Sequence, residues 1–505
     1  MTDLYMHNKF LALLLLLAIP FVSNSQSYTE HPKHEMRGVW VATVANIDWP
    51  SQPGLPVKTQ KKEALAIIQH CQQIGLNTIF LQVRPSTDVL YKSIYEPWSK
   101  VLSGTAGKNP RYDPLKYWIE QAHLHGLELH AWINPYRASM NLNDDLPKLH
   151  PYHQNPEMFV EYGDKLYFNP GHPQSITHIS KVVKELVENY DIDGLHMDDY
   201  FYPYPIKDKQ FPDSATYRKY GKQFDDINAW RRDNVDQAIR SIQTTIRNTK
   251  PWVQFGVSPF GVWRNKSEDP KGSDTKAGAT NYDALHADIL KWMENKWIDY
   301  VVPQLYWGTS HPVANYNKLV DWWNENHYNV PVYIGHGIYK IGNDKPDWQD
   351  PKQLPTQLKN VRQKDHLNGS VYFSYKHLKR DLMGFQDSLI NYYYQHQALV
   401  PQLPGNKDTS ENSRIISLKA NSKRIKWKTE GEKKGLLRKY IVYRYSPFEA
   451  FDPSNPEFIY AISYNNRFKL PKKKSNLKKE YLIRVANLNS YNAEGPLSEP
   501  VRIYY

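Results

Sequence analysis

Residues 61–85, KKEALAIIQHCQQIGLNTIFLQVRP, place a helical pattern directly before a strand pattern. Over residues 61–75 apolar residues recur at spacings of three and four, which is typical of an amphipathic helix. The run NTIFLQVRP (77–85) is β-branched and aromatic, as expected of a buried strand. A similar run, MRGVWVATV (36–44), precedes the helix. Together they predict a strand, helix, strand unit with parallel strands.

The same alternation continues to about residue 376 and gives eight strand patterns. The other six are LELHAWINP (127–135), DGLHMDDYF (193–201), VQFGVSPF (253–260), IDYVVPQLYW (298–307), PVYIGHGI (331–338) and GSVYFSY (369–375). Further helical patterns are ITHISKVVKELVENY (176–190), NVDQAIRSIQTTIRN (234–248) and YDALHADILKWMENK (282–296). We therefore predict an α/β fold, a (β/α)8 TIM barrel over residues 35–400. A doubly wound sheet is the alternative, but the sequence has neither a P-loop nor a Gly-rich phosphate turn after the first strand.

The alternation stops at PQLPGNKDTSENS (401–413), which we interpret as a linker. Residues 414–505 then contain seven short strand patterns without helices, which predicts a small all-β sandwich. Trp427, the run YIVYRYS (440–446) and Tyr481 resemble a fibronectin type III domain. The expected architecture is therefore a TIM barrel followed by a fibronectin type III-like sandwich.

The N-terminus carries an apolar run that is too short to span a bilayer comfortably, FLALLLLLAIPFV (10–22). It follows Lys9 and precedes small residues, so we predict a signal peptide over residues 1–25. The single cysteine, Cys71, lies in a helical pattern, which argues against a lipoprotein and precludes an intrachain disulfide. We expect an exported protein, periplasmic or secreted, without a transmembrane segment after cleavage.

Composition narrows the class of protein further. Hydrophobic residues at 40% and charged residues at 23% exclude widespread disorder and a multi-span membrane protein. Aromatic residues at 13% suit stacking on sugar rings or bases, or a buried aromatic core.

The net charge of +12 is unevenly distributed. Residues 405–505 hold 21 Lys and Arg against 10 Asp and Glu, a net of +11, which leaves +1 for the rest. The predicted barrel is thus almost neutral. The basic runs KRIKWK (423–428) and KKKSNLKK (472–479) form either a solvated face or a contact with an anionic envelope surface. Only the charge suggests nucleic acid, and export argues against it, so we predict no nucleic-acid partner.

In a TIM barrel the active site lies at the carboxyl ends of the strands. The strand pattern 193–201 ends on Asp198 and Asp199. Adjacent carboxylates repel each other, and burial would raise their pKa values, so a purely structural strand gains little from them. Glycoside hydrolysis needs such groups, and we predict that both are catalytic. One should face the barrel centre and the other a flanking loop; a helix-capping Asp beside an exposed one is the structural alternative.

The second acid also has candidates outside this pair. Loop candidates, each more typical of a solvated charge, are Asp88, Glu96, Glu268, Asp269 and Asp274. The spacing of His196, Asp198 and Tyr200 is similar to the acidic strand of chitinase-type barrels, in which the substrate's acetamido group is the nucleophile. Tyr200 stands where those enzymes place the acid, which argues against that mechanism.

Other polar and aromatic residues follow the strand ends and are expected to bind substrate. The donors suited to sugar hydroxyls or a carboxylate are Arg84, Asn134, Arg137, Arg264 and Gln304. The aromatic candidates are Tyr200, Trp263, Tyr306 and Trp307. His130 lies within an apolar run and is interpreted as a core histidine. HExxH, EF-hand and CxxC motifs are missing from the sequence, so we predict neither a metal nor another cofactor.

Six ordered motifs between about Glu35 and Val400 resemble the glycosyl-hydrolase-like family 10, a bacterial group of exported TIM-barrel proteins. They are EMRGVWVATVANIDWPS, FLQVRPSTDVLYKS, HAWINPYR, DGLHMDDYFYP, SPFGVWRN with GSDTKAGATNYD, and DYVVPQLYW. The resemblance implies a glycoside hydrolase, and at least one member cleaves peptidoglycan glycan strands stripped of their stem peptides. It implies active-site strands with Asp198 and Asp199, surrounded by Arg84, Asn134, Trp263, Arg264 and Gln304.

We therefore expect an exported glycoside hydrolase that cleaves the O-glycosyl bonds of cell-wall glycan or of another polysaccharide. The alternative is a non-catalytic carbohydrate-binding protein on a degenerate barrel.

Overall fold

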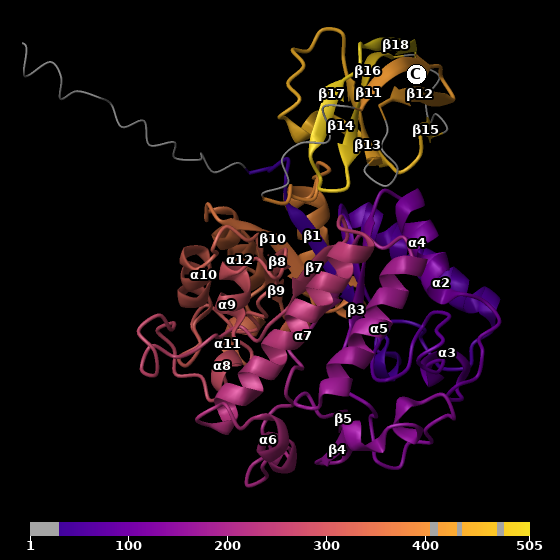
Figure 1. Ribbon diagram of the computed structural model, residues 1–505. Coiled ribbons are helices and arrows are strands. Elements are labelled where there is room, and N and C mark those ends of the chain that lie inside the picture. The colour runs from indigo at the N-terminus through magenta and orange to yellow at the C-terminus, as the bar shows by residue number, and fades with distance from the viewer. Residues whose placement is uncertain (1–29, 405–412, 432–436, 472–478, 505) are drawn as a thin grey trace, which may run out of the picture.

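The computed structural model describes residues 30–404, 413–431, 437–471 and 479–504. An α/β barrel is followed by an all-β unit that lies at one end of it (Figure 1). The predicted signal peptide (1–25), most of the predicted linker and most of the basic run 472–479 lie outside the described residues. Within the described ranges, no helix is both long and apolar enough to cross a membrane.

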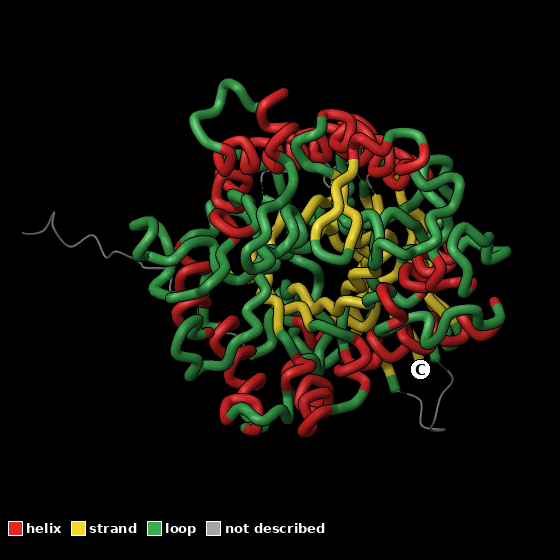
Figure 2. Tube along the Cα trace, turned by 90° about the horizontal axis from the view of Figure 1, so that it is seen from below, coloured by secondary structure: helices red, strands yellow, loops and turns green. Residues whose placement is uncertain are grey.

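All eight predicted barrel strands are present, and they form a closed parallel barrel, which confirms the predicted TIM-barrel fold. Each strand pairs with its neighbours in the chain, and the first pairs with the last through Met36↔Gly369 to Val39↔Tyr372. Figure 2 shows these strands surrounded by helices. The strands are β1 (Met36–Val41), β2 (Thr78–Arg84), β3 (Glu128–Ile133), β6 (Gly194–Met197), β7 (Gln254–Val257), β8 (Tyr300–Val301), β9 (Val332–His336) and β10 (Leu367–Tyr372).

Three predicted helical patterns form long helices, α2 (Val57–Ile74), α5 (Pro173–Asn189) and α7 (Ile227–Thr249). The fourth pattern (282–296) was expected to form one helix and instead forms two. His286 has a φ of +52°, which a helix cannot contain, so the chain breaks there. The two pieces and the remaining helices are α8 (Asn281–Ala284), α9 (Ile289–Glu294), α3 (Lys100–Ser103), α4 (Pro114–Leu124), α6 (Ser214–Tyr220), α10 (Tyr316–Glu325), α11 (Pro346–Gln349), α12 (Gln353–Arg362), α13 (Tyr375–Lys379) and α14 (Phe385–Ser388).

The barrel interior is filled by large side chains, which neighbouring glycines make possible. Trp40, Phe80, Trp132 and Tyr300 belong to one buried cluster inside the barrel. A Cβ atom at Gly256 would lie 2.0 Å from the Tyr300 ring, so only glycine fits there. A second, larger cluster fills the layer between strands and helices.

A buried polar chain runs through this interior. Glu128 lies 3.2 Å from His130, which confirms His130 as a core histidine, and the other ring nitrogen of His130 lies 2.8 Å from the Tyr300 hydroxyl. The same hydroxyl lies 3.1 Å from His196, which contacts the Ser258 hydroxyl at 2.9 Å. The chain thus links the amino end of β3 to the carboxyl end of β7. Burial, and secondarily the charge of His130, lowers the pKa of His196 well below its usual value.

The described residues between 414 and 504, which we call the C-terminal β unit, form two sheets around a shared core with Trp427, Val442 and Val485. The seven predicted strands are present; an eighth, β17, was missed because its sequence, EGPL, contains Gly and Pro. One sheet contains β11 (Arg414–Ala420), β12 (Arg424–Glu430) and β15 (Arg467–Lys469). The other contains β14 (Ile459–Ser463), β13 (Leu437–Tyr445), β16 (Glu480–Asn489), β17 (Glu494–Leu497) and β18 (Val501–Tyr504). A small hairpin, β4 (Phe159–Tyr162) with β5 (Lys165–Phe168), follows β3.

The C-terminal β unit packs against the amino ends of the barrel strands. Lys439 of β13 donates a hydrogen bond to Glu128 at the start of β3, and both side chains are buried. Tyr464 donates to Asp193 at 3.1 Å and stacks on His123 at 3.9 Å between ring centroids. Because the unit covers this end, the carboxyl ends of the strands, on the opposite side, stay uncovered by it (Figure 1).

Candidate active site

Asp198 and Asp199 directly follow β6 and turn toward different neighbours. The interior row of this strand, Gly194 and His196, continues to Asp198, which is 4% exposed. Its carboxylate accepts hydrogen bonds from Trp132 Nε1 at 3.1 Å and from Asn134 Nδ2 at 3.4 Å. Asp198 is therefore the member of the pair that faces the barrel centre.

Asp199 is also buried, and its partners come from the loop that follows it and from the segment after β8. Its carboxylate accepts a hydrogen bond from the Tyr204 hydroxyl and interacts with the side chain of Gln304. Gln304 itself donates to the Ser258 carbonyl at 2.9 Å, which fixes its amide above the strand ends. The pair thus sits between two groups of hydrogen-bond donors.

The environment raises the proton affinity of both carboxyl groups. Burial, and then the neighbouring Asp199, raises the pKa of Asp198 to about 7, against the smaller opposing effects of Arg137 and Trp132. Burial also raises the pKa of Asp199, while Tyr204 and Gln304 act in the opposite direction. A carboxyl group with a pKa near 7 is protonated in about half of the molecules at pH 7 and in most of them at lower pH, so it can act as a proton donor.

A row of aromatic rings extends from the Asp pair. Tyr200, 37% exposed, lies 5.9 Å from Tyr204 between ring centroids, and Tyr204 lies 6.2 Å from Phe260. Phe260 contacts Trp307 at 5.3 Å. The Arg137 guanidinium lies over the Tyr200 ring at 4.5 Å. Rings beside two carboxylates and a guanidinium suit the apolar faces and hydroxyl groups of a sugar.

Tyr306, in the segment after β8, also lies close to the pair. Its ring stacks on Phe373 at 6.2 Å. Burial, and then the charge of Asp199, raises the pKa of its hydroxyl well above the usual value. The structure therefore brings Asp198, Asp199 and six of the predicted binding residues to one region, namely Asn134, Arg137, Tyr200, Gln304, Tyr306 and Trp307.

Arg84, in contrast, lies beneath this region. It is 1% exposed, and its Nε and Nη2 donate to Glu96 at 2.7 and 2.6 Å. Its Nη1 donates to the carbonyl oxygens of Asn134 and Pro135. All its donor nitrogens therefore face the protein, and Arg84 fixes the backbone that carries Asn134 onto Asp198.

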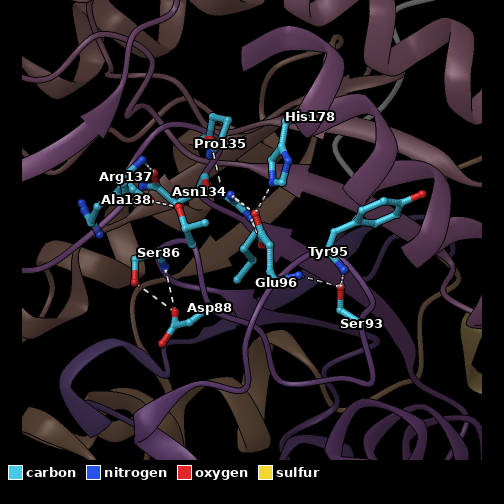
Figure 3. A network of polar contacts seen from close by, with 12 residues as sticks. Ser86, Asp88, Ser93, Tyr95, Glu96, Asn134, Pro135, Arg137, Ala138 and His178 are labelled. Carbon is cyan, nitrogen blue, oxygen red and sulfur yellow. Dashed lines mark hydrogen bonds and ion pairs between the residues drawn. The ribbon is translucent and has the colours of Figure 1, made fainter. Parts of the chain in front are cut away.

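Glu96 completes this support (Figure 3). His178 Nε2 lies 2.9 Å from Glu96 Oε1, the same carboxylate oxygen that accepts from Arg84 Nη2. Burial alone would raise the pKa of Glu96, but the Arg84 guanidinium and the His178 hydrogen bond lower it to about 2. Glu96 is thus held as an anion and is no proton donor.

Two other predicted substrate-binding residues, in the loop after β7, lie away from the Asp pair. Trp263 is 5% exposed, belongs to the layer between strands and helices, and donates to Asp288 at 3.2 Å. Arg264 forms two hydrogen bonds with Asp283 and one with Asp269. Neither residue contacts the Asp pair, because local carboxylates occupy their donor groups.

The other loop carboxylates are held by partners of their own. Asp88 accepts from Ser86 at 3.0 Å, and Glu268 accepts from Asn265 at 3.2 Å. Asp274 pairs with Lys318. Asp198 and Asp199 therefore remain the candidate catalytic carboxylates.

Trp132, Tyr204 and Phe260 are site residues that the sequence analysis missed. Trp132 and Phe260 lie inside strand patterns, where a ring is expected in the core. Tyr204 belongs to the run YFYPY (200–204). The aromatic residues of this run directly follow two carboxylates, and this pattern could have indicated that Tyr204 belongs to the site. Within the described residues, no group of three or more His, Cys, Asp or Glu side chains could hold a metal ion.

The barrel and its Asp pair have counterparts among known proteins. The model of a family described as glycosyl hydrolase-like 10 matches residues 35–351, which include β1 to β9 and the Asp pair. Glycosyl hydrolase YngK of Bacillus subtilis is 47% identical over 395 residues, 77% of this chain and 76% of that protein. Glycosyl hydrolase DigH of Escherichia coli K12 is 37% identical over 386 residues, 72% of this chain and 88% of that protein. The solved glycoside hydrolase domain of PgaB (BpsB) from Bordetella bronchiseptica aligns with a TM-score of 0.45 and 13% identity, over 70% of this chain and 99% of that chain.

Proposed function

The chain belongs to the glycosyl hydrolase-like 10 family, and from this premise we propose that it hydrolyses the O-glycosyl bonds of bacterial cell-wall glycan strands. One observation carries the proposal: a buried carboxyl group with a pKa of about 7, Asp198, stands next to a second carboxylate at the carboxyl end of a barrel strand. Glycoside hydrolysis requires such a proton donor together with a second carboxylate.

In this mechanism Asp198 donates its proton to the oxygen of the leaving sugar as the glycosidic bond breaks. Trp132 and Asn134 hold the carboxyl group in place and stabilise the carboxylate left behind, through the hydrogen bonds described above. Asp199 supplies the second carboxylate, oriented by Tyr204 and Gln304. The aromatic row positions the sugar rings, so orientation comes from groups that do not themselves react.

The substrate test uses purified protein on peptide-free peptidoglycan glycan strands, with intact peptidoglycan and neutral polysaccharides in parallel. We expect new reducing ends from the peptide-free strands. Reducing ends released only from another polysaccharide would support the assignment as a hydrolase and refute the cell-wall substrate. Binding of glycan without any release of reducing ends would support the carbohydrate-binding alternative.

The pH dependence of the reaction should report Asp198. The donor must be protonated, so kcat/KM should fall as pH rises through about 7 and then decrease about tenfold per pH unit. At lower pH the rate should fall again when the second carboxylate takes up a proton. Initial rates of reducing-end release between pH 4 and 9 measure this profile. A rate that stays constant from pH 6 to 9 would contradict the assignment of Asp198 as the acid.

We also propose that residues 1–25 direct export and that the mature chain acts in the periplasm or outside the cell.

The order of strands in the C-terminal β unit supports a fibronectin type III-like fold, with β11, β12 and β15 in one sheet and β14, β13, β16 and β17 in the other. Its basic residues favour contact with an anionic component of the envelope.

A further inference from the structure

A large cleft lies between the C-terminal β unit and the amino end of the barrel, beside the contacts that join them. Its volume is about 1140 Å³. The barrel side is formed by the ends of α2 and α4, including Gln72 and His125, and the other side by β12, β14 and β15. Five cationic side chains line it, and none of the described residues that line it is Asp or Glu. They are Lys423, Arg424, Lys426, Arg467 and Lys469.

The register of the sheet concentrates these charges on one face. In the antiparallel pair β12 and β15, Arg424 stands opposite Lys469, and Lys426 stands opposite Arg467. The residues between them, Ile425 and Phe468, belong to the core cluster of the unit. Since side chains alternate along a strand, all four cations point away from that core.

The next strand adds to the same row, because Lys419 of β11 stands opposite Lys426. Like charges directly opposite each other on a sheet are destabilising. The same sheet does pair a cation with an anion elsewhere. At the other end of the β11 and β12 pair, Arg414 faces Glu430 and binds it at 3.0 Å. The cationic face therefore costs stability, which a bound anion would recover.

We propose that this cleft binds a linear polyanion, a chain that carries repeated phosphate or carboxylate groups. A chain fits better than a bilayer surface because the barrel forms the opposite side of the cleft, which a flat membrane cannot enter. The cleft lies at the end of the barrel opposite the Asp pair, so the inference stands independently of the proposed hydrolase.

The test measures binding of the full chain to fluorescently labelled inorganic polyphosphate and polygalacturonate by anisotropy, with dextran as the neutral polymer and co-sedimentation with phosphatidylglycerol vesicles in parallel. We expect binding to at least one polyanion that weakens with added salt, and none to dextran. Binding to polyphosphate alone assigns phosphate as the recognised group, and binding to polygalacturonate alone assigns carboxylate. Binding to neither, or binding only to phosphatidylglycerol vesicles, would overturn the proposal.

Two sets of variants locate the site. Lys426→Gln with Arg467→Gln should weaken binding about tenfold, as expected from the loss of two partly screened charge contacts. The matched pair Lys181→Gln with Lys184→Gln removes the same charge from the exposed face of α5, outside the cleft, and should leave the affinity unchanged. Equal effects from both pairs would show a response to net charge alone and would refute the cleft.

A charge reversal separates ligand binding from folding. Lys426→Glu places an anion opposite both Lys419 and Arg467, so the melting temperature should hold or rise while polyanion binding is lost. Binding retained by this variant would contradict the proposal. Asp198→Asn should bind the polyanion as the parent does, so failure of the hydrolase assignment and failure of the cleft are distinguishable.

Discussion

Asp198→Asn is expected to lower kcat for glycan cleavage about 10³-fold, within the range for loss of a general acid. The amide has nearly the same shape as the carboxyl group and keeps an oxygen for Trp132 Nε1, but it has no acidic proton to give. The measurement is the rate of reducing-end release at pH 6, where Asp198 in the parent is protonated.

The control for this variant is Asp288→Asn. Asp288 also accepts a hydrogen bond from a tryptophan, Trp263 Nε1 at 3.2 Å, but lies outside the site. It should keep the parental rate. Asp198→Asn should also melt no lower than the parent at pH 8, because a carboxyl group with a raised pKa is costly to ionise in the folded state. If Asp198→Asn retains more than a tenth of the parental rate, Asp198 is not the proton donor.

Arg84→Met is expected to lower the free energy of unfolding by about 3 to 5 kcal/mol, the usual cost of breaking a buried ion pair on one side. Methionine approximates the length of the arginine stem but leaves the Glu96 carboxylate buried without its guanidinium. Urea unfolding at pH 7 measures the change. Activity should fall as well, because the backbone at Asn134 loses its support.

Arg264→Met is the matched control, since Arg264 also pairs with carboxylates but on a more exposed loop. Its expected cost is below about 1 kcal/mol. The double variant Arg84→Met with Glu96→Gln should recover part of the loss, because the uncompensated charge is gone. If Arg84→Met and Arg264→Met lower the free energy of unfolding equally, Arg84 does not support the backbone at Asn134.

The sequence predicts the barrel well because local periodicity sets strands and helices. The site is harder to predict from sequence, because residues of the same type near strand ends bind different partners in the folded protein. Arg84 is the last residue of β2 and Arg264 lies in the loop after β7, and their roles depend on carboxylates 12 and 19 residues away. Such pairing is a property of the folded chain.

The Asp pair illustrates the same limit. Alternation along a strand predicts that its members diverge, but the position of His196 inside the barrel decides which one faces the centre. Likewise, the helical pattern at 282–296 contains no glycine or proline that would predict the break at His286.

The pairing of the first and last barrel strands has a consequence for how the chain folds. Met36 and Gly369 are partners, so the ring cannot close until β10 has been made. Until then β1 and β9 present open sheet edges, which in other proteins promote association between chains. Contacts of such long sequence separation also slow folding. The barrel therefore acquires its native topology late, and a fragment that ends before β10 has no strand with which to complete it.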